Sequence, residues 1–181
     1  ETPARFTQDY QAQVEAVHDD FRLAAVKIGM LGTARSVRAV ARALQALRGV
    51  PLVLDPVMIA SSGARLLEPE AVRALRERLF PLASVITPNV PEAEFLLGIR
   101  IRDARSQDRA AERLRAAGAA AVLLKGGHLP GRGVRDLYLD AGGATAIRHA
   151  RLARNGSKGA WPACVRCVSR WHVEGDCAGT T

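Results

Sequence analysis

The sequence contains no long hydrophobic run. No uninterrupted apolar segment approaches the roughly 20 residues that a helix needs to cross a bilayer, and the opening residues, ETPARFTQDY, show no charged-then-apolar export signal. The sequence therefore predicts a protein without a membrane anchor and with a cytoplasmic location. Its 181 residues suffice for one domain with a hydrophobic core, or for one domain and a tail.

Lysine and aromatic residues are scarce. Only three of the 26 basic residues are lysine, and aromatic residues make up 4% of the chain, although its net charge is +8. No basic helix is interleaved with stacking aromatics. The arginine pattern therefore indicates solvated helix surfaces rather than a nucleic-acid-binding surface. Lys27 and Lys125 stand out because each lies where a predicted strand meets a corner, a place for an ammonium group to meet an anion.

Four short apolar runs are present, and each breaks off at a polar or glycine-bearing corner. They are AVKIGMLG (25–32), LVLDPVM (52–58), SVITPNVPE (84–92) and AVLLKGGH (121–128). Segments with helical spacing lie between them, and this alternation predicts an α/β fold with a mostly parallel sheet. Because functional corners of such folds lie at the carboxyl ends of the strands, we expect four residues to converge on one crevice: Asp55, Asn89, Glu92 and Lys125.

The periodicity of apolar residues predicts where the elements lie. Strands are expected over 24–28, 51–54, 85–87 and 120–124, followed by a hairpin with strands over 135–139 and 145–149. Helices are expected over 8–21, from Thr33 to Gly49, from Pro69 onward, after Asn89 and over 106–117.

The corners together resemble a known family. In their order and spacing, KIGMLG, LVLDPVMIASSGARLLEPEAV, VITPNVPEAEFLLG and AVLLKGGHL resemble the hydroxymethylpyrimidine/phosphomethylpyrimidine kinases of thiamine biosynthesis, which belong to the ribokinase-like superfamily with the pyridoxal kinases. The resemblance spans about residues 10–152. It implies a ribokinase-like three-layer sandwich with a mostly parallel sheet, incomplete at both ends, and a pyrimidine kinase domain over residues 1–153.

The resemblance implies an activity and its cofactors. The expected reaction is ATP-dependent phosphorylation of 4-amino-5-hydroxymethyl-2-methylpyrimidine, and then of its monophosphate, with magnesium. A small pyrimidine is thus the expected substrate, and a pyridoxal-kinase-type activity is the alternative. Homodimers occur in the family, so a homodimer is a further expectation.

The resemblance also assigns a magnesium–phosphate cluster to Asp55, Asn89 and Glu92, held partly through water. Structural alternatives exist for these three residues. Asp55 precedes a proline and has the residue type of a turn. Asn89 and Glu92 have the spacing of a helix N-cap and its partner, with Pro91 between them, a role compatible with metal binding.

Nucleotide and substrate positions follow from the same resemblance. Lys125, Gly126, Gly127 and His128 would bind the phosphates of ATP, with the glycines allowing backbone amides to approach an anion; a strand-end lysine reaching solvent is the alternative for Lys125. Val57 and Met30 would contact the pyrimidine, although residues of these types are ordinarily core.

Two parts of the family's site are not found in the sequence. One is the glycine-rich substrate loop, and the other is the Gly-Thr-Gly-Cys-like loop that supplies the anion hole and the catalytic base. No catalytic residue is therefore identified. The first residue is not methionine, and we expect the chain to begin inside its domain. The resemblance thus predicts that this chain is impaired in catalysis.

The last residues, 154–181, differ in composition from the rest. They contain all three cysteines and both tryptophans, and the helical periodicity vanishes. One hypothesis is a shifted reading frame or a spliced gene end near residue 155. The alternative is a zinc knuckle that binds single-stranded nucleic acid, attached to a non-catalytic remnant, because one set of residues has suitable types and spacing for zinc: Cys164, Cys167, His172 and Cys177.

Overall fold

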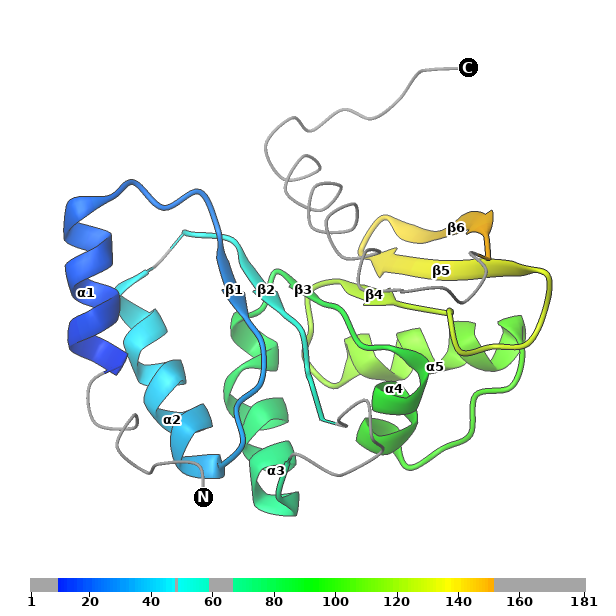
Figure 1. Ribbon diagram of the computed structural model, residues 1–181, viewed down its shortest axis with the longest axis horizontal. Coiled ribbons are helices and arrows are strands. Elements are labelled where there is room, and N and C mark those ends of the chain that lie inside the picture. The colour runs from blue at the N-terminus through cyan, green and yellow to red at the C-terminus, as the bar shows by residue number, and fades with distance from the viewer. Residues whose placement is uncertain (1–9, 48, 59–66, 152–181) are drawn as a thin grey trace. The chain divides into compact units, whose positions relative to one another are not determined.

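The computed structural model describes residues 10–47, 49–58 and 67–151. The chain divides into two units, Glu1–Ala150 and Arg151–Thr181, and the described residues belong almost wholly to the first (Figure 1). Both hypotheses about residues 154–181, including the zinc set Cys164, Cys167, His172 and Cys177, lie outside the described residues.

A six-stranded sheet forms the centre of the first unit, with its strands in sequence order (Figure 1). The strands are β1 (Val26–Ile28), β2 (Leu52–Leu54), β3 (Val85–Ile86), β4 (Val122–Leu124), β5 (Gly133–Asp140) and β6 (Gly143–Ala150). The first four pair in parallel, whereas β5 and β6 form an antiparallel hairpin against β4. The predicted α/β fold with a mostly parallel sheet is therefore confirmed.

Five α-helices accompany the sheet in the described part of the chain. They are α1 (Tyr10–Asp20), α2 (Ala34–Ala43), α3 (Pro69–Arg78), α4 (Val90–Leu97) and α5 (Ala104–Ala116), with short 3-10 turns η2 (Leu44–Ala46) and η3 (Phe80–Leu82). Because the crossovers between successive parallel strands share one hand, α2 to α5 cover the same face of the sheet. The core lies between these helices and the sheet. It includes the fully buried Leu54, Leu75, Phe80, Ile86 and Leu124.

Local capping fixes where the helices begin. Thr33 caps α2, as predicted, and its Oγ1 accepts the backbone amide of Ser36 at 3.2 Å. Helix α5 begins two residues before the predicted Ser106, because Asp103 is its N-cap and Ser106 is the third helical residue of the capping box. The helix predicted to run from Thr33 to Gly49 ends earlier, at Ala43, where the chain tightens into η2.

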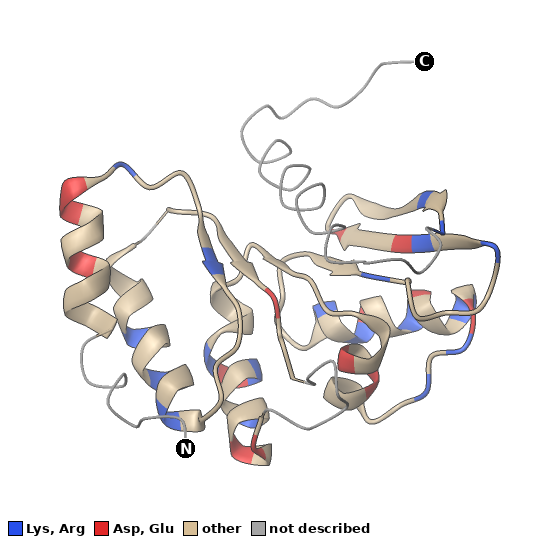
Figure 2. Cartoon of the chain, in the orientation of Figure 1, with Lys and Arg blue, Asp and Glu red and all other residues tan. Residues whose placement is uncertain are grey.

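Charged side chains are spread over the helices (Figure 2). The arginines of α2 are exposed, and those of α3 and α5 alternate with acidic residues, as in the Arg73–Glu77 pair at 2.8 Å. This distribution agrees with the solvated helix surfaces expected from the sequence. In the described part of the chain, every helix is too short or too polar to cross a membrane.

The hairpin contains a tyrosine with an unusual titration. Burial raises the pKa of Tyr138 to about 12, and the neighbouring Asp140 adds to the shift. The folded state thus favours the neutral phenol. The contribution of Tyr138 to stability is therefore complete below the ordinary tyrosine pKa of about 10, and it is lost as the pH rises from there through about 12. We expect the free energy of unfolding of Tyr138→Phe to fall less steeply with rising pH over this window than that of the unmodified chain.

Denaturant unfolding at a series of alkaline pH values would measure this difference. The control is Tyr10→Phe, which removes the other tyrosine of the chain, on helix α1, and leaves Tyr138 in place. In ultraviolet absorbance, the unmodified chain should show a tyrosinate signal that forms only at high pH and that Tyr138→Phe lacks. Identical alkaline profiles for the two variants would contradict the prediction.

Candidate functional site

Asp55 is the centre of a polar cluster at the carboxyl edge of the parallel strands. It directly follows β2, and only 3% of its surface is exposed. Its Oδ1 accepts hydrogen bonds from Lys125 Nζ at 3.0 Å and from Thr87 Oγ1 at 3.1 Å. On the other side, Lys27 Nζ lies 3.9 Å from Oδ2. One buried carboxylate thus faces two ammonium groups from strands at opposite ends of the parallel set.

Strand alternation explains why Lys27, Asp55, Thr87 and Lys125 meet. Each is adjacent in sequence to a residue buried in the helix-covered core, namely Ile28, Leu54, Ile86 and Leu124. Because side chains alternate between the faces of a sheet, the polar four project on the face away from these helices. Backbone pairing continues past the strand ends, for example from the Asp55 amide to the Ile28 carbonyl at 2.9 Å, and keeps the four in register.

Asn89 and Glu92 form a complete capping box at the start of α4. Asn89 Oδ1 accepts the Glu92 amide at 2.9 Å, and Glu92 Oε2 accepts the Asn89 amide at 2.7 Å. The backbone of Asn89 also pairs with that of Lys125, which brings the box to the same edge as Asp55. The structural role foreseen for this pair is therefore present, and the magnesium role remains a prediction.

Burial changes the titration of two charged groups in the cluster. It raises the pKa of the Glu92 carboxyl, although the amide of Asn89 and the ammonium of Lys125 pull the pKa the other way. It also lowers the pKa of Lys27, against the attraction of Asp55. Both shifts arise from poor solvation, and in such a site a charged ligand interacts more strongly with a charged side chain than it would in bulk water.

The glycine corner after β4 is fixed by groups that the sequence analysis did not select. The Gly126 amide donates to Asp136 Oδ1 at 2.7 Å, and the other oxygen of Asp136 lies 3.0 Å from His149 Nε2. Gln107 is fully buried and donates to the carbonyls of Leu124 and Arg135 at 3.2 and 3.0 Å. These contacts join residues 10 to 28 positions apart, so no local motif signals them.

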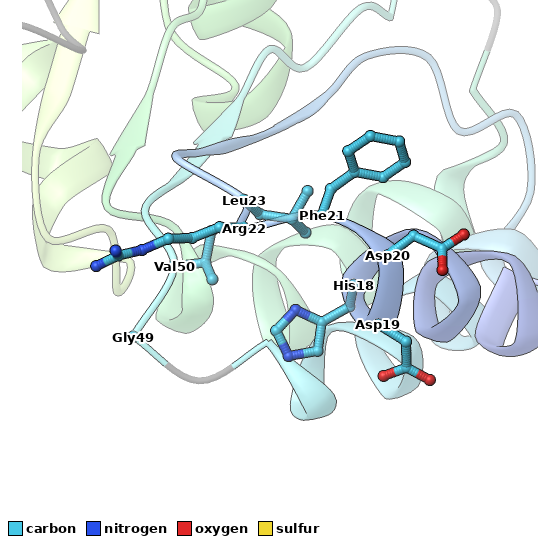
Figure 3. A pocket seen from close by; sticks show the side chains of 8 residues that line it. All are labelled: His18, Asp19, Asp20, Phe21, Arg22, Leu23, Gly49 and Val50. Carbon is cyan, nitrogen blue, oxygen red and sulfur yellow. The ribbon is translucent and has the colours of Figure 1, made fainter.

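Two cavities in the described part of the chain lie at opposite ends of the parallel strands. One of about 290 Å³ lies beside Gly126 and is lined in part by Gln107, Arg135 and His149. The other, of about 490 Å³, lies where α1 ends and where the chain enters β1 and β2. Its lining side chains point in different directions rather than towards a common centre (Figure 3). Of these two cavities, the smaller one lies at the carboxyl edge with the polar cluster.

The remaining predicted site residues lie at this edge with different exposure. Met30 follows β1 and is 57% exposed, so the core alternative for this methionine is wrong, and its contact with the substrate stays a prediction. Val57 follows β2 and is half-buried, and His128 is exposed on the glycine corner. Thr87 was missed as a site residue, although it begins the Thr-Pro-Asn segment in which Asn89 was selected.

The oxygen donors at this edge suit only one manner of magnesium binding. The described residues contain no group of three or more His, Cys, Asp or Glu side chains placed to hold a metal ion. Asp55 and Glu92 are engaged by internal donors, whereas magnesium takes oxygen ligands and keeps part of its water shell. Asp55, Asn89 and Glu92 therefore fit an ion held through water rather than one bound directly.

Solved structures define the class of protein to which this fold belongs. A phosphomethylpyrimidine kinase from Clostridium difficile matches with a TM-score of 0.69 and 39% identity, over 76% of this chain and 59% of that one. The ADP complex of Bacillus subtilis pyridoxal kinase matches with a TM-score of 0.73 and 32% identity, over 82% and 57%. The chain thus has the fold of the ribokinase-like kinases.

Sequence comparison identifies the family within that class. The profile of the phosphomethylpyrimidine kinase family matches residues 6–165, so the chain belongs to this family. The hydroxymethylpyrimidine/phosphomethylpyrimidine kinase of Haemophilus influenzae is 55% identical over 118 residues, which cover 65% of this chain and 44% of that protein. The chain spans about half the length of the curated relatives that it matches.

Proposed function

We propose that this chain takes part in the ATP-dependent phosphorylation of 4-amino-5-hydroxymethyl-2-methylpyrimidine, and then of its monophosphate. The observation that carries the proposal is the buried Asp55 between Lys27 and Lys125, beside a glycine corner, at the carboxyl edge of a parallel sheet. Phosphoryl transfer asks a protein mainly for positioning and for neutralisation of phosphate charge. Such a cluster of charges on a rigid sheet edge suits both tasks.

The nucleotide would lie on the β4 side of this edge. Lys125 would place its ammonium group beside the phosphates, and the backbone of Gly126 and Gly127 would approach them closely. Asp55, Asn89 and Glu92 would hold magnesium through water, and the bound ion would neutralise phosphate charge. The ADP complex of the related pyridoxal kinase supports an adenine nucleotide as the donor.

The acceptor would lie on the side of β1 and β2. Met30 and Val57 follow these strands, and both keep surface exposed for contact with an aromatic ring. Pyridoxal is the second candidate acceptor, favoured by the structural likeness to pyridoxal kinase. A homodimer is also proposed, and sedimentation of the purified chain would test it.

Calorimetric titration with ATP and magnesium tests the nucleotide site. Because Lys125→Met removes the ammonium group beside the phosphates, we expect it to weaken binding about tenfold or more. Arg42→Met, which removes an exposed positive charge on α2, should bind like the unmodified chain. Equal binding by Lys125→Met and the unmodified chain would contradict the proposed site.

Release of ADP in the presence of each acceptor tests the reaction. Because the sequence predicts impaired catalysis, we expect slow ADP release, which the hydroxymethylpyrimidine stimulates more than pyridoxal does. The opposite order would favour the second candidate acceptor.

A further inference from the structure

The polar cluster places two ammonium groups beside one buried carboxylate. Lys125 Nζ is 3.0 Å from this carboxylate, which also accepts the Thr87 hydroxyl, so Asp55 is already paired on Oδ1. Lys27 Nζ approaches only to 3.9 Å, at Oδ2, and a third of its side chain is exposed. Two ammonium groups therefore share one carboxylate on this face of the sheet, and Lys27 lies farther from it than Lys125 does.

The two lysines belong to different sides of the site. Lys125 precedes Gly126 on the β4 side, where the nucleotide phosphates are proposed to lie. Lys27 lies in β1, three residues before the exposed Met30, on the side proposed for the acceptor. Strands β2 and β3 separate the backbones of the two lysines, and the two ammonium groups meet different oxygens of Asp55. One lysine is thus placed for each of two anionic groups.

The hydroxymethylpyrimidine and its monophosphate, the two successive acceptors of the proposed reaction, differ in charge. The hydroxymethylpyrimidine has no phosphate, whereas its monophosphate carries about −1.5 to −2 near neutral pH. Bringing the phosphate of the monophosphate towards the triphosphate of ATP places like charges close together, and a nearby cation lowers this repulsion. A site that accepts the monophosphate therefore benefits from a second cation on the acceptor side.

We propose that Lys27 binds the phosphate of the monophosphate acceptor and so sets the preference of this site for a phosphorylated over an unphosphorylated pyrimidine. The inference rests on the proposed function and assigns Lys27 to specificity. A purely structural Lys27, acting only as a counterion of Asp55, would instead affect both acceptors alike, because neither would meet its ammonium group.

Calorimetric titration of the full chain with each acceptor distinguishes these roles. We expect Lys27→Met to weaken binding of the monophosphate about 10- to 100-fold, while binding of the unphosphorylated pyrimidine changes less than about twofold. Lys27→Arg keeps the positive charge and should retain most of the preference for the monophosphate. Arg42→Met serves as the control for loss of a distant positive charge.

Three results would overturn the inference. One is an equal loss of affinity for both acceptors in Lys27→Met, the second is no loss for either, and the third is an unmodified chain that shows no preference for the monophosphate. Titration with ATP and magnesium separates these from failure of the proposed function. If the unmodified chain binds the nucleotide and Lys125→Met does not, the kinase site stands even where the Lys27 assignment fails.

Discussion

Asp55→Asn is expected to lower the free energy of unfolding by about 3 kcal/mol, the lower end of the range for breaking a buried ion pair. Asparagine keeps the size of the side chain and an oxygen for Thr87, but it leaves Lys27 and Lys125 facing each other without their carboxylate. The lower end of the range applies because both lysines are about a third exposed, which allows water to screen them.

An anion should recover part of this loss. Inorganic phosphate can bind between the two ammonium groups in Asp55→Asn, so it should stabilise the variant more than it stabilises the unmodified chain. Urea unfolding followed by far-ultraviolet circular dichroism, with and without phosphate, measures both effects. The control Asp19→Asn removes an exposed carboxylate on α1 and should change stability by less than about 0.5 kcal/mol.

Two observations would contradict this account of the cluster. If Asp55→Asn is as stable as the unmodified chain, the ion pairs do not contribute to folding. If phosphate stabilises Asp55→Asn no more than Asp19→Asn, the two lysines do not form an anion site when the carboxylate is absent.

Gly126→Ala is expected to destabilise the fold by about 3 kcal/mol or more, the upper end of the cost of overpacking. A Cβ at this position would overlap the backbone carbonyl of Arg135 and would also press on Gln107. The obstructing atoms belong mainly to β5, so relief requires a backbone shift rather than a change of side-chain rotamer. Such a shift would also move the Gly126 amide away from Asp136.

The neighbouring glycine offers a matched control. A Cβ at Gly127 would meet no atom within 4 Å, so Gly127→Ala should fold with nearly unchanged stability. Urea unfolding compares the two variants, and amide hydrogen exchange should show faster opening at β4 and β5 in Gly126→Ala alone. Equal stability of the two variants would show that β5 yields easily to the added methyl group.

Local chemistry made much of this chain readable from its sequence. The Asn89–Glu92 box, the Thr33 cap and Pro69 in a first helical turn each depend on residues within four positions, so their patterns predict the observed geometry. The α5 start was misplaced because Ser106 and Asp103 are both good N-cap residues, and the pattern alone did not rank them. The helix break at Ala43 was missed because the apolar spacing continues through η2.

The sequence by itself determined the strand–helix order and the polar corners, because short-range periodicity and capping carry that information. Tertiary structure alone decided what those corners do to one another. Lys125 reaches Asp55 across 70 residues of sequence, and the shared burial of Asp55 between two lysines follows from strand order and register. The sequence does not separate Gly126 from Gly127; the carbonyl of Arg135 does, because β5 packs against one glycine and leaves the other open.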